Sequence, residues 1–362
     1  MLTSAYAVSA RLPFNPGLNQ TVLADLPGLP PGAAGSRVNQ WLCSWAIGQR
    51  MASSPELVTA ACALAGGVDR LRPLPTVEAE PTPTSALIVS GGPWPTLLNA
   101  LVSQGFPPAT VLADDLGRVL GGLVGTLARS SAASRAGRPE WPVSHWEAWR
   151  RAQRVAVGGG IVVDALGRRM VEAAKVQLVE AAVPVDVFLA REPSGLVLRG
   201  AAAGDVTPGL PVGLVLDCGG TTLKAAVVAS GVLQPRPGVP APGVGWTGRE
   251  LVEHLAQAAA QAAPPGDGHL GVALALATYV DDSGQPYADQ LGPYAGLGSL
   301  DLVGDLTLSL TRRLGRPVTV RVRHDGASAL LGARLDDPRV DAAIVLGTAV
   351  GHAVRCRGSG ST

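Results

Sequence analysis

Residues 214–228 restrict the fold of this chain most, because two apolar runs flank the turn sequence DCGGTTLK (217–224). Two apolar runs joined by a glycine turn predict a β-hairpin. Gly219 and Gly220 permit positive φ and leave room for a phosphate beside backbone N–H groups. Asp217 can hold Mg²⁺ through water, and Lys224 adds a positive charge. The segment therefore predicts a phosphate-binding hairpin, although an ordinary hairpin with a Gly-Gly turn has the same pattern.

A second candidate site lies at residues 318–333, where VTVRVRHD predicts a strand and GASALLGA a helix. Asp325 stands at the junction of the two elements. A carboxylate there can accept a proton from a substrate hydroxyl as a general base. The alternative is a helix N-cap, which needs no ligand.

Two further strands are expected to end in small residues. AIVLGTAVG (343–351) predicts a strand that enters a turn at Gly347 and Thr348, where backbone donors could reach a phosphate. RVAVGGG (154–160) predicts a strand that ends in three glycines, on which a flat ligand could lie. A flexible glycine loop explains the second pattern equally well.

Between these motifs, apolar strands alternate with helical patterns, which predicts a mixed α/β fold with helices packed over the sheet. Residues 38–64 are predicted to form helices, with Ser54 as a cap before Pro55 in the first turn. SALIVSGG (85–92) and PATVLADD (108–115) are predicted to be strands, and PLPTVEAEPTPT (73–84) a linker.

Composition limits the classes of partner and the compartment. The chain has 362 residues, enough for two domains, with 47% apolar residues, 16% charged residues and a net charge of +1. This balance excludes a field that attracts nucleic acid or an anionic membrane. The cysteines are too scattered for a zinc site or a disulfide framework. With no signal peptide and no apolar run long enough to span a bilayer, we expect a cytoplasmic protein.

Taken together, the motifs resemble those of the ROK-type sugar kinases of the actin/hexokinase/Hsp70 superfamily. DCGGTTLKAAVV (217–228) is similar to the first phosphate loop of that family, Asp-x-Gly-Gly-Thr-x-x-Lys. HDGASALLGA (324–333) resembles its catalytic strand–helix junction, where Asn-Asp precedes small residues. IVLGTAVGHAV (344–354) resembles its second phosphate loop, Leu-Gly-Thr-Gly-x-Gly. The resemblance covers residues 214–354, and the spacing of the three motifs also fits.

The resemblance implies two ribonuclease-H-like, actin-like ATPase domains with a nucleotide cleft between them. It also implies ATP-dependent phosphorylation of a hydroxyl on a sugar or amino sugar, with ATP and Mg²⁺ as cofactors. Polyphosphate remains an alternative donor, and a homodimer remains open. By the family pattern, the site residues are Asp325 as the catalytic base, His324 and Asp325 for substrate, Asp217 for the metal, Gly158, Gly159 and Gly160 for adenosine, and Gly219, Gly220, Thr221, Thr222, Lys224, Gly347 and Thr348 for phosphates.

The order of the motifs departs from the family, whose adenosine motif follows the second phosphate loop. Here the similar segment lies upstream, around residues 154–203, and the sequence ends at Thr362. The resemblance therefore implies a circular permutation. Residues 1–205 would correspond to the family's C-terminal domain, 206–212 to a linker, and 213–362 to its N-terminal domain. Gly91-Gly92 is an alternative adenosine turn.

Other departures favour alternative functions. The Gly-Glu-x-Gly-His sugar motif and the zinc-binding cysteine cluster of the family are absent, and Ala349 replaces a glycine of the second phosphate loop. His324 stands where the family has Asn. These differences favour a non-catalytic nucleotide or sugar sensor on the same fold as the alternative. An unrelated α/β scaffold with glycine turns is the third hypothesis.

Overall fold

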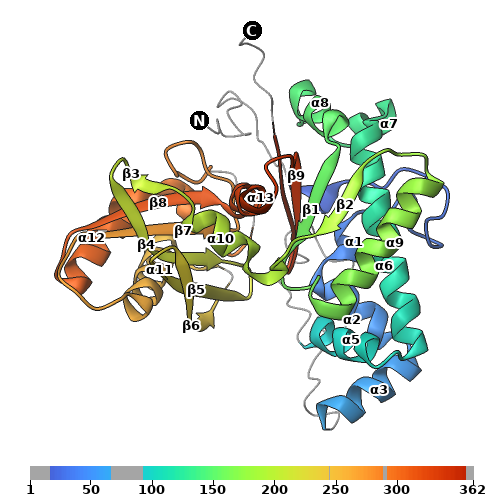
Figure 1. Ribbon diagram of the computed structural model, residues 1–362, viewed down its shortest axis with the longest axis horizontal. Helices are drawn as coiled ribbons and strands as arrows, with labels where there is room; N and C mark the ends of the chain where they lie inside the picture. The colour runs from blue at the N-terminus through green and yellow to red at the C-terminus, as the bar shows by residue number, and fades with distance from the viewer. Residues whose placement is uncertain (1–16, 67–92, 244, 288–291, 356–362) are drawn as a thin grey trace. The chain divides into compact units, whose positions relative to one another are not determined.

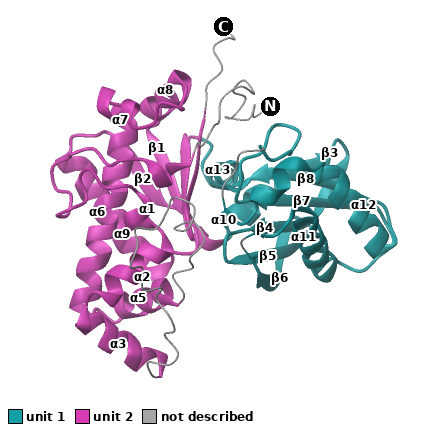
Figure 2. Cartoon of the chain, turned by 180° about the vertical axis from the view of Figure 1, so that it is seen from behind, with its two compact units in different colours: residues 1–15, 195–338 teal, residues 16–194, 339–362 magenta. Residues whose placement is uncertain are grey.

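The computed structural model describes residues 17–66, 93–243, 245–287 and 292–355. Its contacts divide the chain into two compact units, coloured separately in Figure 2. Unit 1 contains residues 195–338, and unit 2 contains the described residues of 16–194 and 339–362. Both units combine a mixed β-sheet with helices, which confirms the mixed α/β fold (Figure 1).

Unit 1 is built on one sheet in which the strand order is β6-β5-β4-β7-β8. β5 runs antiparallel to both β4 and β6, while β7 and β8 run parallel to β4. A short strand, β3, pairs with the start of β4. The strands are β3 (Asp205–Thr207), β4 (Leu210–Cys218), β5 (Thr222–Ala229), β6 (Val232–Pro240), β7 (Leu270–Leu276) and β8 (Val318–His324).

Helices cover this sheet because its strands present apolar side chains to both faces. Alternate residues of β4, β7 and β8 form the main core cluster with α11 (Gly248–Ala262) and α12 (Leu302–Leu314). The intervening residues face the other side. There, α10 (Leu196–Ala202) and α13 (Asp325–Asp336) pack against the sheet and against each other.

Helices α10 and α13 approach closely because glycines stand at their contact. A Cβ atom at Gly200 would lie 1.6 Å from the carbonyl oxygen of Ser328, and one at Gly332 would lie 2.3 Å from that of Leu196. Arg321 and Arg323 on β8 then donate hydrogen bonds to carbonyl oxygens at the C-terminal end of α10. This arrangement satisfies groups that a helix end leaves without internal partners.

Unit 2 contains a smaller sheet with the order β10-β9-β1-β2, in which only β10 is antiparallel to its neighbour. The strands are β1 (Arg154–Gly158), β2 (Asp186–Leu189), β9 (Ala342–Leu346) and β10 (Val350–Val354). The helices are α1 (Asn39–Leu42), α2 (Ser44–Ala52), α3 (Pro55–Ala65), α5 (Trp94–Ser103), α6 (Pro107–Arg129), α7 (Ala132–Ala136), α8 (Val143–Arg151) and α9 (Asp164–Glu180).

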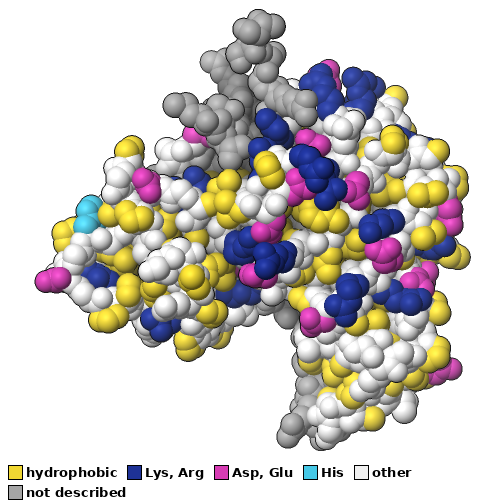
Figure 3. All heavy atoms as spheres, viewed as in Figure 1, with side chains coloured by type: hydrophobic (Ala, Val, Ile, Leu, Met, Phe, Trp, Pro, Cys, Tyr) yellow, Lys and Arg dark blue, Asp and Glu magenta, His cyan; other side chains and the backbone are white. Residues whose placement is uncertain are grey.

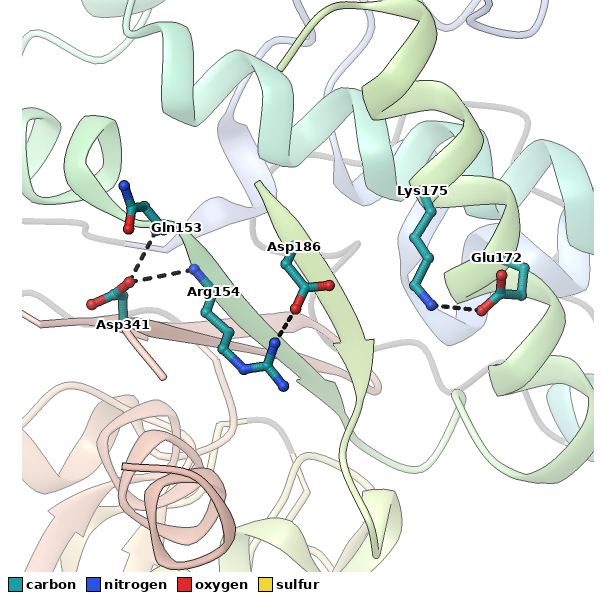
Figure 4. A network of polar contacts seen from close by, with 6 residues as sticks. All are labelled: Gln153, Arg154, Glu172, Lys175, Asp186 and Asp341. Carbon is teal, nitrogen blue, oxygen red and sulfur yellow. Dashed lines mark hydrogen bonds and ion pairs between the residues drawn. The ribbon is translucent and has the colours of Figure 1, made fainter. Parts of the chain in front are cut away.

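Side-chain contacts connect segments of unit 2 that are distant in sequence. Figure 4 shows the carboxylate of Asp341, at the start of β9, accepting hydrogen bonds from the backbone N–H groups of Gln153 and Arg154 at 3.0 and 3.3 Å. Arg154 also forms an ion pair with Asp186 on β2. These contacts fix the amino-terminal edges of β9, β1 and β2 together.

Several local predictions are confirmed. Ser54 accepts a hydrogen bond from the backbone N–H of Leu57, with Pro55 as the first residue of α3. Apart from these predicted features, Trp146 and Trp149 on α8 pack into the core of unit 2, where His145 and His352 are also buried. No helix in the described part of the chain combines the length and apolarity needed to span a bilayer.

Other predictions are wrong. PATVLADD (108–115) belongs to helix α6, because Pro107 and Pro108 occupy a first helical turn that tolerates proline. The predicted linker 206–212 instead contributes to β3 and β4. The predicted boundary also differs from the observed units, because β9 and β10 pair with β1 in unit 2. Residues 73–92, with the predicted linker, the strand 85–92 and Gly91-Gly92, lie outside the described residues.

Candidate functional site

The candidate site of unit 1 lies at the carboxyl ends of three neighbouring parallel strands. Cys218 on β4 pairs with Leu276 on β7, and Leu276 pairs with His324 on β8. The three strands therefore end at the same level. In open α/β sheets this edge is where ligands bind, because the loops and helix N-termini that follow the strands converge there. The predicted residues 217–224 and Asp325 all lie at this edge.

Asp217 and Lys224 face each other across the antiparallel pair β4–β5. They are register partners, and Lys224 Nζ lies 3.4 Å from Asp217 Oδ2. The side chain of Asp217 is only 10% exposed, whereas that of Lys224 is 40% exposed. Burial raises the pKa of Asp217 to about 6, against the opposing effect of Lys224, and the charge of Asp325 raises it further.

Asp325 is the first residue of α13 and follows directly on β8. Its Oδ1 accepts a hydrogen bond from the backbone N–H of Gly326 at 2.6 Å and lies 3.0 Å from Nε2 of His324. Burial raises the pKa of Asp325 to about 7, although the hydrogen bond from Gly326 acts in the opposite direction. The structure therefore holds one buried carboxylate, Asp217, and one largely buried carboxylate, Asp325, electrostatically coupled at one edge of the sheet.

The turn between β4 and β5 differs from its predicted conformation. Neither Gly219 nor Gly220 has positive φ. Gly219 is instead favoured by a close approach, because a Cβ atom there would lie 3.3 Å from the carbonyl oxygen of Thr222. Thr221 and Thr222 are exposed, so their hydroxyl groups are accessible to a ligand.

Two tyrosines support this edge from the loop after β7, and the sequence interpretation missed both. Tyr294, which is 1% exposed, donates its hydroxyl hydrogen to the carbonyl oxygen of Gly219 at 2.9 Å. The ring of Tyr279 stacks on that of His324, with centroids 4.1 Å apart and planes inclined by 22°. The sequence did contain a signal for these residues, because three of its four tyrosines, Tyr279, Tyr287 and Tyr294, lie close together in the chain.

In unit 2, the three predicted adenosine glycines lie beside the predicted second phosphate turn. Gly158 pairs with Val345, and the backbone N–H of Ile161 donates to the carbonyl oxygen of Leu346 at 3.2 Å. Gly159 has a φ of 107°, and a Cβ atom there would lie 2.2 Å from the same oxygen. Gly160 is exposed and has open space around its Cβ position.

The second phosphate turn is fixed by backbone contacts. The N–H of Gly347 donates to the carbonyl oxygen of Ala349 at 3.1 Å, and the N–H of Ser44 donates to that of Gly347 at 2.9 Å. Thr348 is partly exposed. The structure thus brings the predicted residues together in two groups. Residues 217–224, 324 and 325 lie in unit 1, and residues 158–160, 347 and 348 lie in unit 2.

The residues of unit 1 fit a hydrated divalent cation. No group of three or more His, Cys, Asp or Glu side chains suited to a metal occurs within the described residues. Mg²⁺ does not need such a cage, since it keeps several waters and binds through one or two carboxylates together with substrate phosphates. The two coupled carboxylates have Lys224 as a neighbouring cation, which leaves one net negative charge to attract a divalent ion.

Charges elsewhere on the molecule are interspersed. Figure 3 shows acidic side chains next to basic ones on the face it presents. Ion pairs between oppositely charged side chains include Arg169–Asp114 and Arg118–Glu180. Such a surface lacks the single-sign field of a polyanion-binding face.

The assignment of this site depends on the geometry of its residues. Searches against protein-family models, curated proteins and solved structures return no significant match to this chain.

Proposed function

We propose that this protein binds ATP with Mg²⁺ and transfers the terminal phosphoryl group to a hydroxyl of a small, sugar-like molecule. The observation that carries the proposal is the pair of carboxylates at the carboxyl edge of the sheet in unit 1, the buried Asp217 and the largely buried Asp325, whose side chain is 16% exposed. Burial of carboxylates is unfavourable for folding unless they are neutralised, so such pairs are found mostly where function requires them.

The topology supports the ribonuclease-H-like fold that the sequence suggested. In unit 1 the first three strands, β4, β5 and β6, form an antiparallel meander, and β7 and β8 join β4 in parallel after helical connections. In unit 2, β9 and β10 form an antiparallel pair beside the parallel strands β1 and β2. We infer a permuted order in which unit 2 takes strands from both ends of the sequence.

Each residue of the edge in unit 1 has a chemical role in this proposal. Asp217 would hold the hydrated Mg²⁺, which neutralises phosphate charge when bound. Lys224 and the turn 219–222 would contact phosphate oxygens. The substrate oxygen would attack the terminal phosphorus while the bond from phosphorus to the ADP oxygen breaks, and the hydroxyl proton would pass to Asp325. A carboxylate with a pKa near 7 suits this role at neutral pH.

We further propose that the glycine turns of unit 2 bind nucleotide. Gly158–Gly160 would provide the backbone surface for adenosine, and Gly347 and Thr348 would contribute donors to the phosphates. The pairing of β1 with β9, which places these two turns side by side, supports this assignment.

A non-catalytic sensor of nucleotide or sugar is the second candidate. The absence of the Gly-Glu-x-Gly-His sugar motif and the presence of His324 where the family has Asn favour it. In this case MgATP would bind without being consumed.

The decisive experiment measures MgATP binding by calorimetry and phosphoryl transfer to a panel of hexoses and amino sugars, with polyphosphate as a second donor. Asp325→Asn should bind MgATP but lose transfer by a factor of about 100 or more. Asp305→Asn, a matched carboxylate change on α12, should retain both. Binding without transfer would favour the sensor, and absence of binding in the wild type would refute both candidates.

A further inference from the structure

His324 is the last residue of β8 and is 4% exposed. Its Nε2 atom lies 3.0 Å from Oδ1 of Asp325, within hydrogen-bonding distance. On its face, the ring is stacked against that of Tyr279, which is itself 8% exposed. The strand, the stacked ring and the carboxylate together hold the imidazole in one orientation.

The contacts of Asp325 are asymmetric. Its Oδ1 faces both Nε2 of His324 and the backbone N–H of Gly326, at 3.0 and 2.6 Å. Two donors that converge on one oxygen fix the rotation of the carboxylate. The other oxygen, Oδ2, is therefore the atom that can approach a substrate hydroxyl.

When Asp325 is ionised, a histidine can make this contact in only one of its neutral tautomers, the one with the hydrogen on Nε2. Burial favours the neutral ring and lowers the pKa of His324 to about 3. A neutral donor orients the carboxylate and leaves its negative charge in place, so Asp325 stays able to accept a proton.

We propose that His324 is a positioning residue that, braced by Tyr279, donates its Nε2 hydrogen to Asp325 Oδ1 and so directs Oδ2 toward the acceptor hydroxyl. The inference rests on the proposed phosphoryl-transfer function for its catalytic consequence. The hydrogen-bonded tautomer itself is a property of the protein alone, and it can be measured without any substrate.

The first measurement is the tautomer. Long-range ¹H–¹⁵N spectra of the full-length protein at neutral pH contain signals from five histidines, and the His324 signal is assigned by its loss in His324→Gln. We expect the Nε2–H form. A signal from the Nδ1–H form would overturn the proposal, because Nε2 could then not donate to Asp325.

The second measurement uses MgATP with water as the acceptor, since no sugar needs to be known. His324→Phe keeps a ring against Tyr279 but removes the hydrogen-bond donor. We expect this variant to release phosphate about 100-fold more slowly than the wild type, with a Kd for MgATP within about twofold of the wild-type value. The amide nitrogen of His324→Gln reaches the position of Nε2, so this variant should recover most of the rate. His269→Gln is the matched control, because His269 is exposed at the opposite end of β7.

The outcomes separate the two proposals. Equal rates for wild type and His324→Phe, or recovery by His324→Asn instead of His324→Gln, would overturn the positioning role, since the shorter amide does not reach Oδ1. If the wild-type protein neither binds nor hydrolyses MgATP, the proposed function fails. In that case the tautomer measurement alone tests whether His324 donates a hydrogen bond to Asp325.

Discussion

Lys224 on β5 lies opposite Asp217 on β4, with 3.4 Å between Nζ and Oδ2. This distance is longer than that of a strong charge-assisted hydrogen bond. The ammonium group is therefore held near the carboxylate and can still turn toward a phosphate.

Replacement of Lys224 by Met should weaken MgATP binding by about tenfold, which corresponds to about 1.4 kcal/mol. The loss reflects one charged hydrogen bond to a phosphate oxygen. Titration calorimetry provides the measurement, and Lys175→Met, on helix α9 of unit 2, is the control. Unchanged affinity in Lys224→Met would exclude a phosphate contact by this residue.

The carboxyl group of Asp325 makes stability depend on pH. The pKa of Asp325 rises from 3.8 to about 7 on folding. The contribution of this carboxyl group to the free energy of unfolding is therefore complete below pH 3.8 and is lost as the pH rises through about 7. Asp325→Asn removes the buried charge and should increase the free energy of unfolding at pH 8 by about 1–2 kcal/mol. The difference should become small at pH 4.

Urea unfolding of wild type and Asp325→Asn at the two pH values checks this prediction. Asp305→Asn should change the unfolding free energy by less than about 0.5 kcal/mol at either pH. A variant less stable than wild type at pH 8 would mean that the carboxylate of Asp325 stabilises the fold.

The contact between α10 and α13 should not tolerate an added methyl group. Gly200→Ala would place its Cβ atom 1.6 Å from the carbonyl oxygen of Ser328, so the two helices must separate. We expect a loss of about 3 kcal/mol in the free energy of unfolding. Gly268→Ala, where nothing lies within 4 Å of the Cβ position, should show little loss. Similar melting temperatures for both variants would contradict the observed packing.

The glycines after β1 should differ in their tolerance of alanine. Gly159→Ala combines a φ of 107° with a Cβ position 2.2 Å from the carbonyl oxygen of Leu346, so we expect a loss of about 2–4 kcal/mol. Gly160→Ala has open space and should fold normally. If this turn binds adenosine, Gly160→Ala should still weaken MgATP binding. Normal stability of Gly159→Ala would argue against the described turn.

The strands of unit 1 were predictable where their side chains follow a clear pattern. The alternation of apolar and polar side chains in β8 and the apolar runs around Asp217 specify buried strands. In unit 2, the start of α3 was predictable because its signals, Ser54 and Pro55, lie at the helix's own N-terminus. The sequence did not reveal β6, which contains Pro235, Pro237 and Pro240. Proline is tolerated there because β6 is an edge strand and needs fewer ladder hydrogen bonds.

Long-range pairing was the least predictable feature. Nothing local in residues 342–354 indicates that β9 pairs with β1, nearly two hundred residues upstream. The sequence interpretation therefore grouped β9 and β10 with the strands of unit 1, whereas they belong to unit 2. The supports of the site were missed for a similar reason. Tyr279 and Tyr294 reach His324 and Gly219 only after the loop following β7 has folded over the sheet edge.

A crystal structure of the full-length protein with Mg²⁺ and a non-hydrolysable ATP analogue tests the central claim most directly. We predict a triphosphate against residues 219–222, with the cation near Asp217 and the terminal phosphate near Asp325. An analogue bound away from Asp217 and Asp325, or no bound analogue at saturating concentration, would contradict the account.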